Sequence, residues 1–267
     1  MHRRFAHPSK DVLQHTSGNT KNFPSIKFLS QNPVCRGCAE GKMTGSSFPP
    51  SQTRATKSFG KIHMDLKSFP VQLYHGYSYM IIYLDDYTSY GWIQLLEAKS
   101  DAKASIKQFV ALVKTRYNSS IVEVMIDARG EFKSKALTTF LKDLGITILT
   151  SIPHMHQQNG CTECFIRTLM DKAQALHFDA CLPQSWWEFC VLYASHVYNC
   201  TPIQCHHWKT PFEILEHGQP DVSHLQVLGC GAYVFLLEDV NPNKLAPHAE
   251  LMTFIGLNWL LLHDGWW

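Results

Sequence analysis

Long apolar runs are missing from this 267-residue chain. Without a stretch of about 18 apolar residues, a membrane-spanning helix is not expected. The first residues, Met-His-Arg-Arg, lack the apolar run that a secretory signal peptide needs. Charged residues make up only 17% of the chain and the formal net charge is +2, so no basic tail marks a nucleic-acid-binding protein. We therefore expect no membrane partner, and any contact with nucleic acid must be argued from local sites.

An even set of cysteines, which a disulfide scaffold would need, is also lacking. The chain has nine cysteines, and this odd number in a chain of this size fits a reducing compartment. Hydrophobic residues make up 45% of the chain, which is enough to bury a substantial core. We expect an intracellular protein with one large domain and one or two small modules.

The N-terminal segment, 1–50, contains four candidate metal ligands. This segment has little hydrophobic periodicity, so it needs a staple to fold. The ligands are two paired histidines and two paired cysteines: His2, His7, Cys35 and Cys38. Two imidazoles and two thiolates suit tetrahedral zinc. The alternative is that these four residues bind no metal and occur by chance in a flexible N-terminus. The spacing predicts a structural zinc site, and chelation is then expected to unfold this segment alone.

From Lys61 onward, strand and helix patterns alternate along the chain. Strands are predicted at 61–69, 77–87, 92–97, 121–126 and 146–152, and helices at 101–117, 134–144, from about 162 onward, and at 186–198. Three consecutive strands suggest an antiparallel meander, which crossover connections extend with parallel strands. After Leu225 the chain indicates short strands of a small β module.

Three acidic residues are candidates for catalysis. Asp65 and Asp127 each end a predicted strand, Glu163 opens a predicted helix, and 35 residues lie between the last two. Carboxylates that converge at one edge of a sheet can hold two Mg²⁺ ions roughly 4 Å apart, which suits phosphodiester chemistry. The alternative is that such acids are ordinary solvated turn residues, and we favour that alternative for Asp85 and Asp86.

Taken together, the His-His-Cys-Cys cluster and the spaced acids resemble retroviral and retrotransposon integrases, in detail the copia-type lineage. The resemblance covers roughly residues 2–257, and it is carried by the stretches HRRFAHPS, CRGCAEGK, LDDYTSYGW, GEFKSKAL, QQNG, NCTP, KTPFEIL, LGCGAYVF and FIGL. It implies an α/β fold, a ribonuclease H-like mixed five-stranded sheet with flanking helices. It also implies Mg²⁺ or Mn²⁺ dependence, with 3′-end processing and strand transfer of element DNA into target DNA by Asp65, Asp127 and Glu163.

The same resemblance divides the chain and suggests its partners. We expect a zinc module at 1–50, a linker at 51–57, a catalytic domain at 58–215, a partial SH3-like module at 222–257 and an off-family tail at 258–267, the last resembling read-through past a truncation or frameshift. We expect DNA as the partner, a homo-oligomer when active, nuclear localisation at integration, and no small-molecule substrate. The weaker candidates for DNA contact are Arg167, Lys172, His154 and His156. Protease and reverse transcriptase segments are lacking, which suggests one piece of a polyprotein.

Several positions depart from the family pattern. Arg129 stands where the family has glycine. An arginine could not easily adopt a backbone conformation that only glycine favours. The family usually has basic or small residues at the positions of Cys161, Thr162 and Cys164, and a basic residue at those of Cys200 and Cys205. Fewer cations weaken binding to phosphates. Two hypotheses follow: an active polynucleotidyl transferase, or a folded nucleic-acid-binding remnant of a decaying copy. The upstream zinc cluster disfavours an unrelated ribonuclease H-like nuclease.

Overall fold

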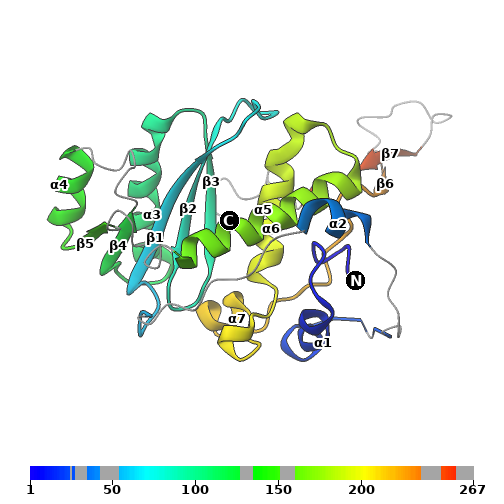
Figure 1. Ribbon diagram of the computed structural model, residues 1–267, viewed down its shortest axis with the longest axis horizontal. Helices are drawn as coiled ribbons and strands as arrows, with labels where there is room; N and C mark the ends of the chain where they lie inside the picture. Colours follow the sequence, from blue (N-terminus) through cyan, green and yellow to red (C-terminus); the bar gives the residue numbers. More distant parts are fainter. Residues whose placement is uncertain are drawn as a thin grey trace.

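The computed structural model describes residues 1–24, 26–27, 35–42, 54–126, 135–150, 160–235 and 248–256. The helices are α1 (Lys10–Asn19), α2 (Arg36–Lys42), α3 (Ala102–Arg116), α4 (Lys135–Asp143), α5 (Gly160–Ala180), α6 (Trp187–Asn199) and α7 (Pro211–Glu216), with short 3-10 turns at Lys99–Asp101, Gln184–Trp186 and Gln204–His206. The strands are β1 (Lys61–Ser68), β2 (Tyr79–Asp85), β3 (Gly91–Leu96), β4 (Glu123–Ile126), β5 (Thr147–Thr150), β6 (Gly231–Phe235) and β7 (Ala249–Thr253). Figure 1 shows their arrangement.

Five strands form one mixed sheet in the order β3-β2-β1-β4-β5. The strands β1, β2 and β3 are an antiparallel meander, in which Asp65 lies opposite Ile82. The strand β4 pairs with β1 in parallel, with Met64 beside Ile126, and β5 continues in parallel beyond it. The predicted meander and its parallel extension are therefore confirmed, and α3 makes the crossover from β3 to β4.

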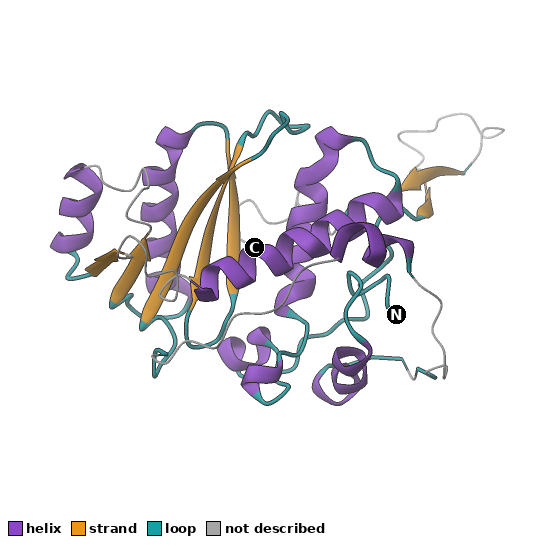
Figure 2. Ribbon diagram, viewed as in Figure 1, coloured by secondary structure: helices purple, strands orange, loops and turns teal. Residues whose placement is uncertain are grey.

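Alternating side chains of the sheet supply two separate cores. Ile62 and Met64 of β1 pack with the α3 residues Ile106 and Phe109 on one face. On the other face, β2 residues such as Ile82 pack with α5 and α6. This follows from the two-residue period of a strand, which directs successive side chains to opposite faces. Figure 2 shows the sheet between these two helical layers.

The N-terminal segment packs against the far side of α5 and α6. Phe5 is fully buried in the same core as Tyr193 of α6. On α2, Gly41 lies so close to α5 that an added Cβ would be 3.0 Å from the backbone nitrogen of Ala175. His15 of α1 stacks on Trp208, with ring centroids 4.0 Å apart. The segment therefore has a core, and it shares that core with α5 and α6.

The C-terminal part described by the structure is a two-stranded antiparallel sheet of β6 and β7. Its large apolar side chains are exposed, with Tyr233 at 78% and Phe235 at 66%. The predicted small β module is present as this pair of strands, the SH3-like assignment stays a prediction, and the tail at 258–267 lies outside the described residues. Among the helices that the structure describes, none is long and apolar enough to cross a membrane.

Candidate active site and metal centre

The four predicted zinc ligands meet in space. His2 Nε2 lies 3.2 Å from Cys38 Sγ, and His7 Nδ1 lies 3.1 Å from Cys35 Sγ and 3.6 Å from Cys38 Sγ. All four ligand atoms lie within 4.8 Å of one another. Tetrahedral zinc, with bonds of about 2.0–2.1 Å to nitrogen and 2.3 Å to sulfur, puts its donor atoms about 3.3–3.8 Å apart, near the three nitrogen-to-sulfur distances above. The donor set and its geometry therefore fit zinc.

Neighbouring groups orient the two imidazoles. His2 Nδ1 lies 3.0 Å from the carbonyl oxygen of Pro8, an arrangement that fixes the ring and leaves Nε2 for a metal. In the His7 ring, Nε2 is buried and has no hydrogen bond within the described residues. It lies 3.8 Å from a carboxylate oxygen of Asp179. Gly37, between the two cysteines, leaves room for this ring, because a Cβ there would lie 3.1 Å from His7 Cε1.

Burial sets the protonation of these ligands. Burial, followed by the neighbouring His2, lowers the pKa of His7 to about 4, so this imidazole is neutral near pH 7. Burial, followed by the neighbouring Cys35, raises the pKa of Cys38 to about 11. A neutral imidazole can donate its lone pair directly, whereas a thiol in this environment needs a cation to become a thiolate.

Asp65 lies on the sheet face that α5 covers. Directly opposed residues of antiparallel strands share a face, and its partner Ile82 is buried in the α5–α6 core. The Asp65 carboxylate accepts a hydrogen bond from the Leu66 amide at 2.8 Å, and its other oxygen lies 3.2 Å from Lys67 Nζ. Its side chain is 18% exposed, so the carboxylate is partly accessible.

Glu163 lies in the first turn of α5 and is exposed. Two residues later, Phe165 fixes this end of the helix to the sheet, because its ring occupies the place of a side chain at Gly91. Asp127, the third predicted carboxylate, lies outside the described residues, which end on this strand at Ile126. The structure thus brings Asp65 and the start of α5 to one side of the sheet, and the convergence of all three acids stays a prediction.

The chain is similar in sequence and in fold to known proteins. Residues 55–156 match the family described as "Integrase core domain". The chain is 30% identical over 258 residues to the "Retrovirus-related Pol polyprotein from transposon RE1" of Arabidopsis thaliana, which covers 96% of this chain and 17% of that polyprotein. The chain carries the integrase core domain of a copia-type retrotransposon Pol polyprotein. It is also 25% identical over 256 residues to the Pol polyprotein from transposon TNT 1-94 of Nicotiana tabacum, covering 96% of this chain and 19% of that one.

The integrase segment is thus similar to a small part of larger proteins, since it spans less than a fifth of the length of these curated relatives. A chain in the cryo-electron-microscopy structure of the simian T-cell lymphotropic virus intasome with PP2A regulatory subunit B56 gamma aligns with a TM-score of 0.52 at 16% identity. That alignment covers 80% of this chain and 74% of the other. It identifies the shared fold as the ribonuclease H-like fold.

Two acids of the integrase core that we expected to be solvated are buried. Asp85 is 0% and Asp86 4% exposed, so that expectation is wrong. Burial raises the pKa of Asp85, while its carboxylate accepts hydrogen bonds from the Thr88 amide and hydroxyl at 2.9 and 2.7 Å. Burial acts to raise the pKa of Asp86, but hydrogen bonds from His63 and from the Ala55 amide outweigh it and lower the pKa. Asp85 thus holds the turn together, and Asp86 ties it to β1 and to Ala55, because buried acids need such partners.

The expected DNA-contacting residues of the integrase core divide into three cases. Lys172 is 5% exposed, and burial, followed by the charge of Lys42, lowers its pKa to about 7, so its amine is not offered to a DNA phosphate here. Arg167 is exposed, and it donates a hydrogen bond to Cys164 Sγ at 3.8 Å. His154 and His156 lie outside the described residues.

A structural contact that the sequence did not predict fixes the edge of the sheet. Asn199, the last residue of α6, donates from Nδ2 to the carbonyl oxygen of Gly91 at 2.8 Å and accepts from the Gly91 amide at 3.0 Å. In the sequence it is the first residue of the Asn-Cys-Thr-Pro stretch. The only sign of this contact in the sequence is an amide side chain at the end of a largely apolar helix.

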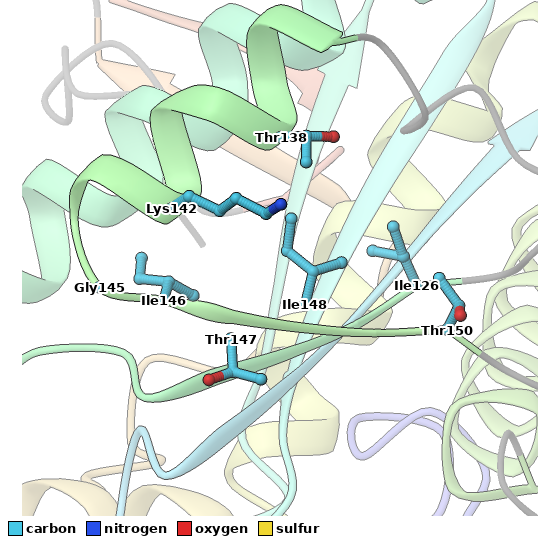
Figure 3. Close-up of a pocket in the computed structure, with 8 residues that line it drawn as sticks. All are labelled: Ile126, Thr138, Lys142, Gly145, Ile146, Thr147, Ile148 and Thr150. Carbon is cyan, nitrogen blue, oxygen red and sulfur yellow. The ribbon is translucent and has the colours of Figure 1, made fainter.

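A surface hollow of about 700 Å³ lies between α4 and β5. Figure 3 shows Lys142 extending from α4 over this hollow, with Ile148 and Thr150 on the opposite wall. Neither Asp65 nor Glu163 lines it. The hollow is therefore separate from these two carboxylates.

Proposed function

We propose that this integrase core joins element DNA ends to target DNA by metal-dependent polynucleotidyl transfer, with 3′-end processing before strand transfer. Asp65, Asp127 and Glu163 are the proposed metal carboxylates. The observation that carries the proposal is the placement of Asp65 on the sheet face covered by α5, which has Glu163 exposed in its first turn.

The role of the chain is to hold acidic side chains on rigid elements. Asp65 belongs to the central strand of the sheet, and Glu163 to a helix that packs along that sheet. Asp127 follows directly after Ile126, which pairs with Met64, the residue before Asp65. A pair of divalent ions held by such carboxylates supplies an activated water or 3′-hydroxyl and stabilises the leaving oxygen.

Replacing Glu163 by glutamine tests this proposal. Glu163→Gln keeps the shape of the side chain and removes its charge, so we expect joining of pre-cut element ends in Mn²⁺ to fall by about 100-fold or more. The side chain is exposed, so the free energy of unfolding should change by less than about 0.5 kcal/mol. Glu97→Gln, at another exposed glutamate, is the matched control. Equal joining by the two variants would exclude Glu163 as a metal carboxylate.

A second candidate function is a folded, nucleic-acid-binding remnant without activity. The burial of Lys172 and the pairing of Asp65 with Lys67 favour it, because both reduce what the site offers to DNA and to metal ions. Arg129 beside Asp127, and Cys161 and Cys164 around Glu163, point the same way in the sequence.

The triple reversion Arg129→Gly, Cys161→Arg and Cys164→Arg separates the two candidates. If this copy has decayed, the reversion should raise both DNA affinity and metal-dependent joining, because it removes a cation near the metal carboxylates and restores cations for phosphates. DNA affinity is measured over a series of salt concentrations, where a steeper dependence reports the added phosphate contacts. Full joining by the original chain, or no gain on reversion, would contradict decay.

A further inference from the structure

One ring nitrogen of the four zinc ligands is buried beside α5. His7 faces the two cysteines with Nδ1, which lies 3.1 Å from Cys35 Sγ and 3.6 Å from Cys38 Sγ. Its other ring nitrogen, Nε2, has no hydrogen bond to the residues that the structure describes. A carboxylate oxygen of Asp179, in the last turn of α5, lies 3.8 Å from this nitrogen.

We propose that Asp179 is a positioning residue of the zinc centre, whose carboxylate accepts a hydrogen bond from His7 Nε2 when a metal ion is bound to Nδ1. This inference rests on zinc binding by the four ligands and is independent of the proposed DNA joining. A neutral imidazole that gives its Nδ1 lone pair to a metal ion carries its proton on Nε2. Leaving this buried N–H without an acceptor is unfavourable, whereas a carboxylate acceptor fixes the ring and makes it a better metal ligand.

The movement that this hydrogen bond requires is small. A nitrogen-to-oxygen hydrogen bond is about 2.7–3.2 Å long, so Asp179 Oδ2 must come closer to His7 Nε2 than the observed 3.8 Å by less than about 1.2 Å. The Asp179 side chain is 21% exposed, which leaves its carboxylate room to turn. Arg3, in the same N-terminal turn as His7, already donates to this oxygen at 2.5 Å, so the carboxylate is directed toward that turn.

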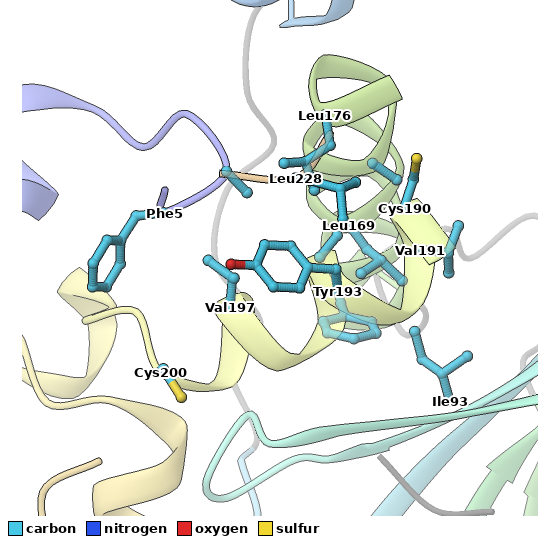
Figure 4. Packing of buried hydrophobic residues seen from close by; sticks show 14 of the residues in the cluster. Phe5, Ile93, Leu169, Leu176, Cys190, Val191, Tyr193, Val197, Cys200 and Leu228 are labelled. Atoms are coloured by element: carbon cyan, nitrogen blue, oxygen red, sulfur yellow. The ribbon is translucent and has the colours of Figure 1, made fainter. Parts of the chain in front are cut away.

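Buried packing fixes the position of Asp179 relative to His7. Phe5, two residues before His7, and Leu176, three residues before Asp179, belong to one hydrophobic core. Figure 4 shows both side chains in this core, together with Tyr193 of α6. The N-terminal turn and the last turn of α5 are therefore held side by side, and a helix of the ribonuclease H-like fold contributes to the zinc centre.

The zinc affinity of the full-length chain tests the proposal, measured by competition with a chelator of known zinc affinity. Asp179→Ala should weaken zinc binding by about 10- to 100-fold, the usual effect of losing the hydrogen-bond partner of a metal-bound histidine. Asp143→Ala removes an exposed carboxylate from α4, far from the N-terminal segment (Figure 1), and is the matched control that should leave the affinity unchanged.

A further variant separates the contact with His7 from the ion pair with Arg3. Arg3→Gln removes that ion pair and keeps the Asp179 carboxylate. The arginine side chain is 55% exposed, and such pairs contribute little, so zinc affinity should fall by no more than about fivefold. A loss in Arg3→Gln as large as that in Asp179→Ala would assign the effect to the ion pair and overturn the proposal.

Nuclear magnetic resonance supplies a readout that a merely structural role of Asp179 would not change. In the zinc-bound chain with isotope-labelled histidine, the His7 Nε2 proton should resonate far downfield, because a hydrogen bond to a carboxylate is short and strong. It should move upfield in Asp179→Ala. An unchanged proton resonance, or equal zinc affinity in Asp179→Ala and the original chain, would overturn the proposal alone. A chain that binds no zinc would overturn the zinc centre together with it.

Discussion

The Asp65 carboxylate forms an ion pair with a neighbouring lysine. Lys67, two residues further along β1, places its ammonium 3.2 Å from one carboxylate oxygen. The two side chains share a strand face, because alternate residues of a strand point the same way. A divalent ion and this ammonium would compete for the same oxygen, so the pair opposes metal binding at the proposed active site.

Removing that ammonium should therefore favour metal binding. The lysine side chain is 49% exposed, and pairs of this kind contribute about 0.2–1 kcal/mol. We expect Lys67→Gln to tighten Mn²⁺ binding by up to about fivefold, the factor that corresponds to about 1 kcal/mol. Isothermal titration calorimetry on the zinc-saturated chain measures it, with Lys103→Gln on the opposite helical layer as the control. Weaker Mn²⁺ binding in Lys67→Gln alone would mean that Lys67 supports the metal site.

At the scale of elements, one asparagine fastens α6 to the edge of the sheet. Asn199 makes two hydrogen bonds to the backbone of Gly91, and it is 2% exposed. On the other side of Gly91, the ring of Phe165 brings α5 against β3. The absence of a side chain at Gly91 thus lets α5 approach β3 at the residue to which α6 is hydrogen-bonded.

Asn199→Ala should therefore destabilise the fold. It leaves the amide and carbonyl groups of Gly91 without these partners, and an unsatisfied buried polar group costs about 1–3 kcal/mol. We expect a loss of about 2–4 kcal/mol in the free energy of unfolding, measured as a lower urea midpoint at unchanged slope. Gln14→Ala, at an exposed position of α1, is the control and should change little. A loss equal to that of Gln14→Ala would show that Gly91 finds other partners.

The sequence predicted elements better than their contacts. Strands and helices follow from local periodicity, so the meander, the crossovers and the paired zinc ligands could all be predicted from spacing. The burial of Asp86 and Lys172 could not, because it depends on which distant segments cover them. The weak hydrophobic periodicity of the N-terminal segment predicts little core for the same reason. Phe5 has few apolar neighbours in sequence, yet it packs against α6, which lies in the C-terminal half of the chain.

For the whole molecule, that shared core joins the His-His-Cys-Cys cluster to the helical layer of α5 and α6. Leu13 of α1 and Leu176 of α5 belong to one buried cluster, to which Leu225 and Leu228 also contribute. The packing of α2 on α5 places the cysteine ligands next to Ala175, and Asp179 of the same helix faces His7. A change at the zinc centre therefore alters the surroundings of the helix that has Glu163 in its first turn.

Chelation of zinc should accordingly reach beyond the N-terminal segment. Without the metal, α2 is held to the N-terminal turn only by weaker contacts, such as the hydrogen bonds from Lys42 to Ala6 and His7, so α2 should separate from α5 more often and expose apolar surface to water. We expect amide hydrogen exchange along residues 170–180 to accelerate after chelation, together with that of residues 1–42. Exchange in α3, on the opposite layer, is the internal control and should change least. Faster exchange confined to residues 1–42 would instead show a zinc module that folds independently of the integrase core.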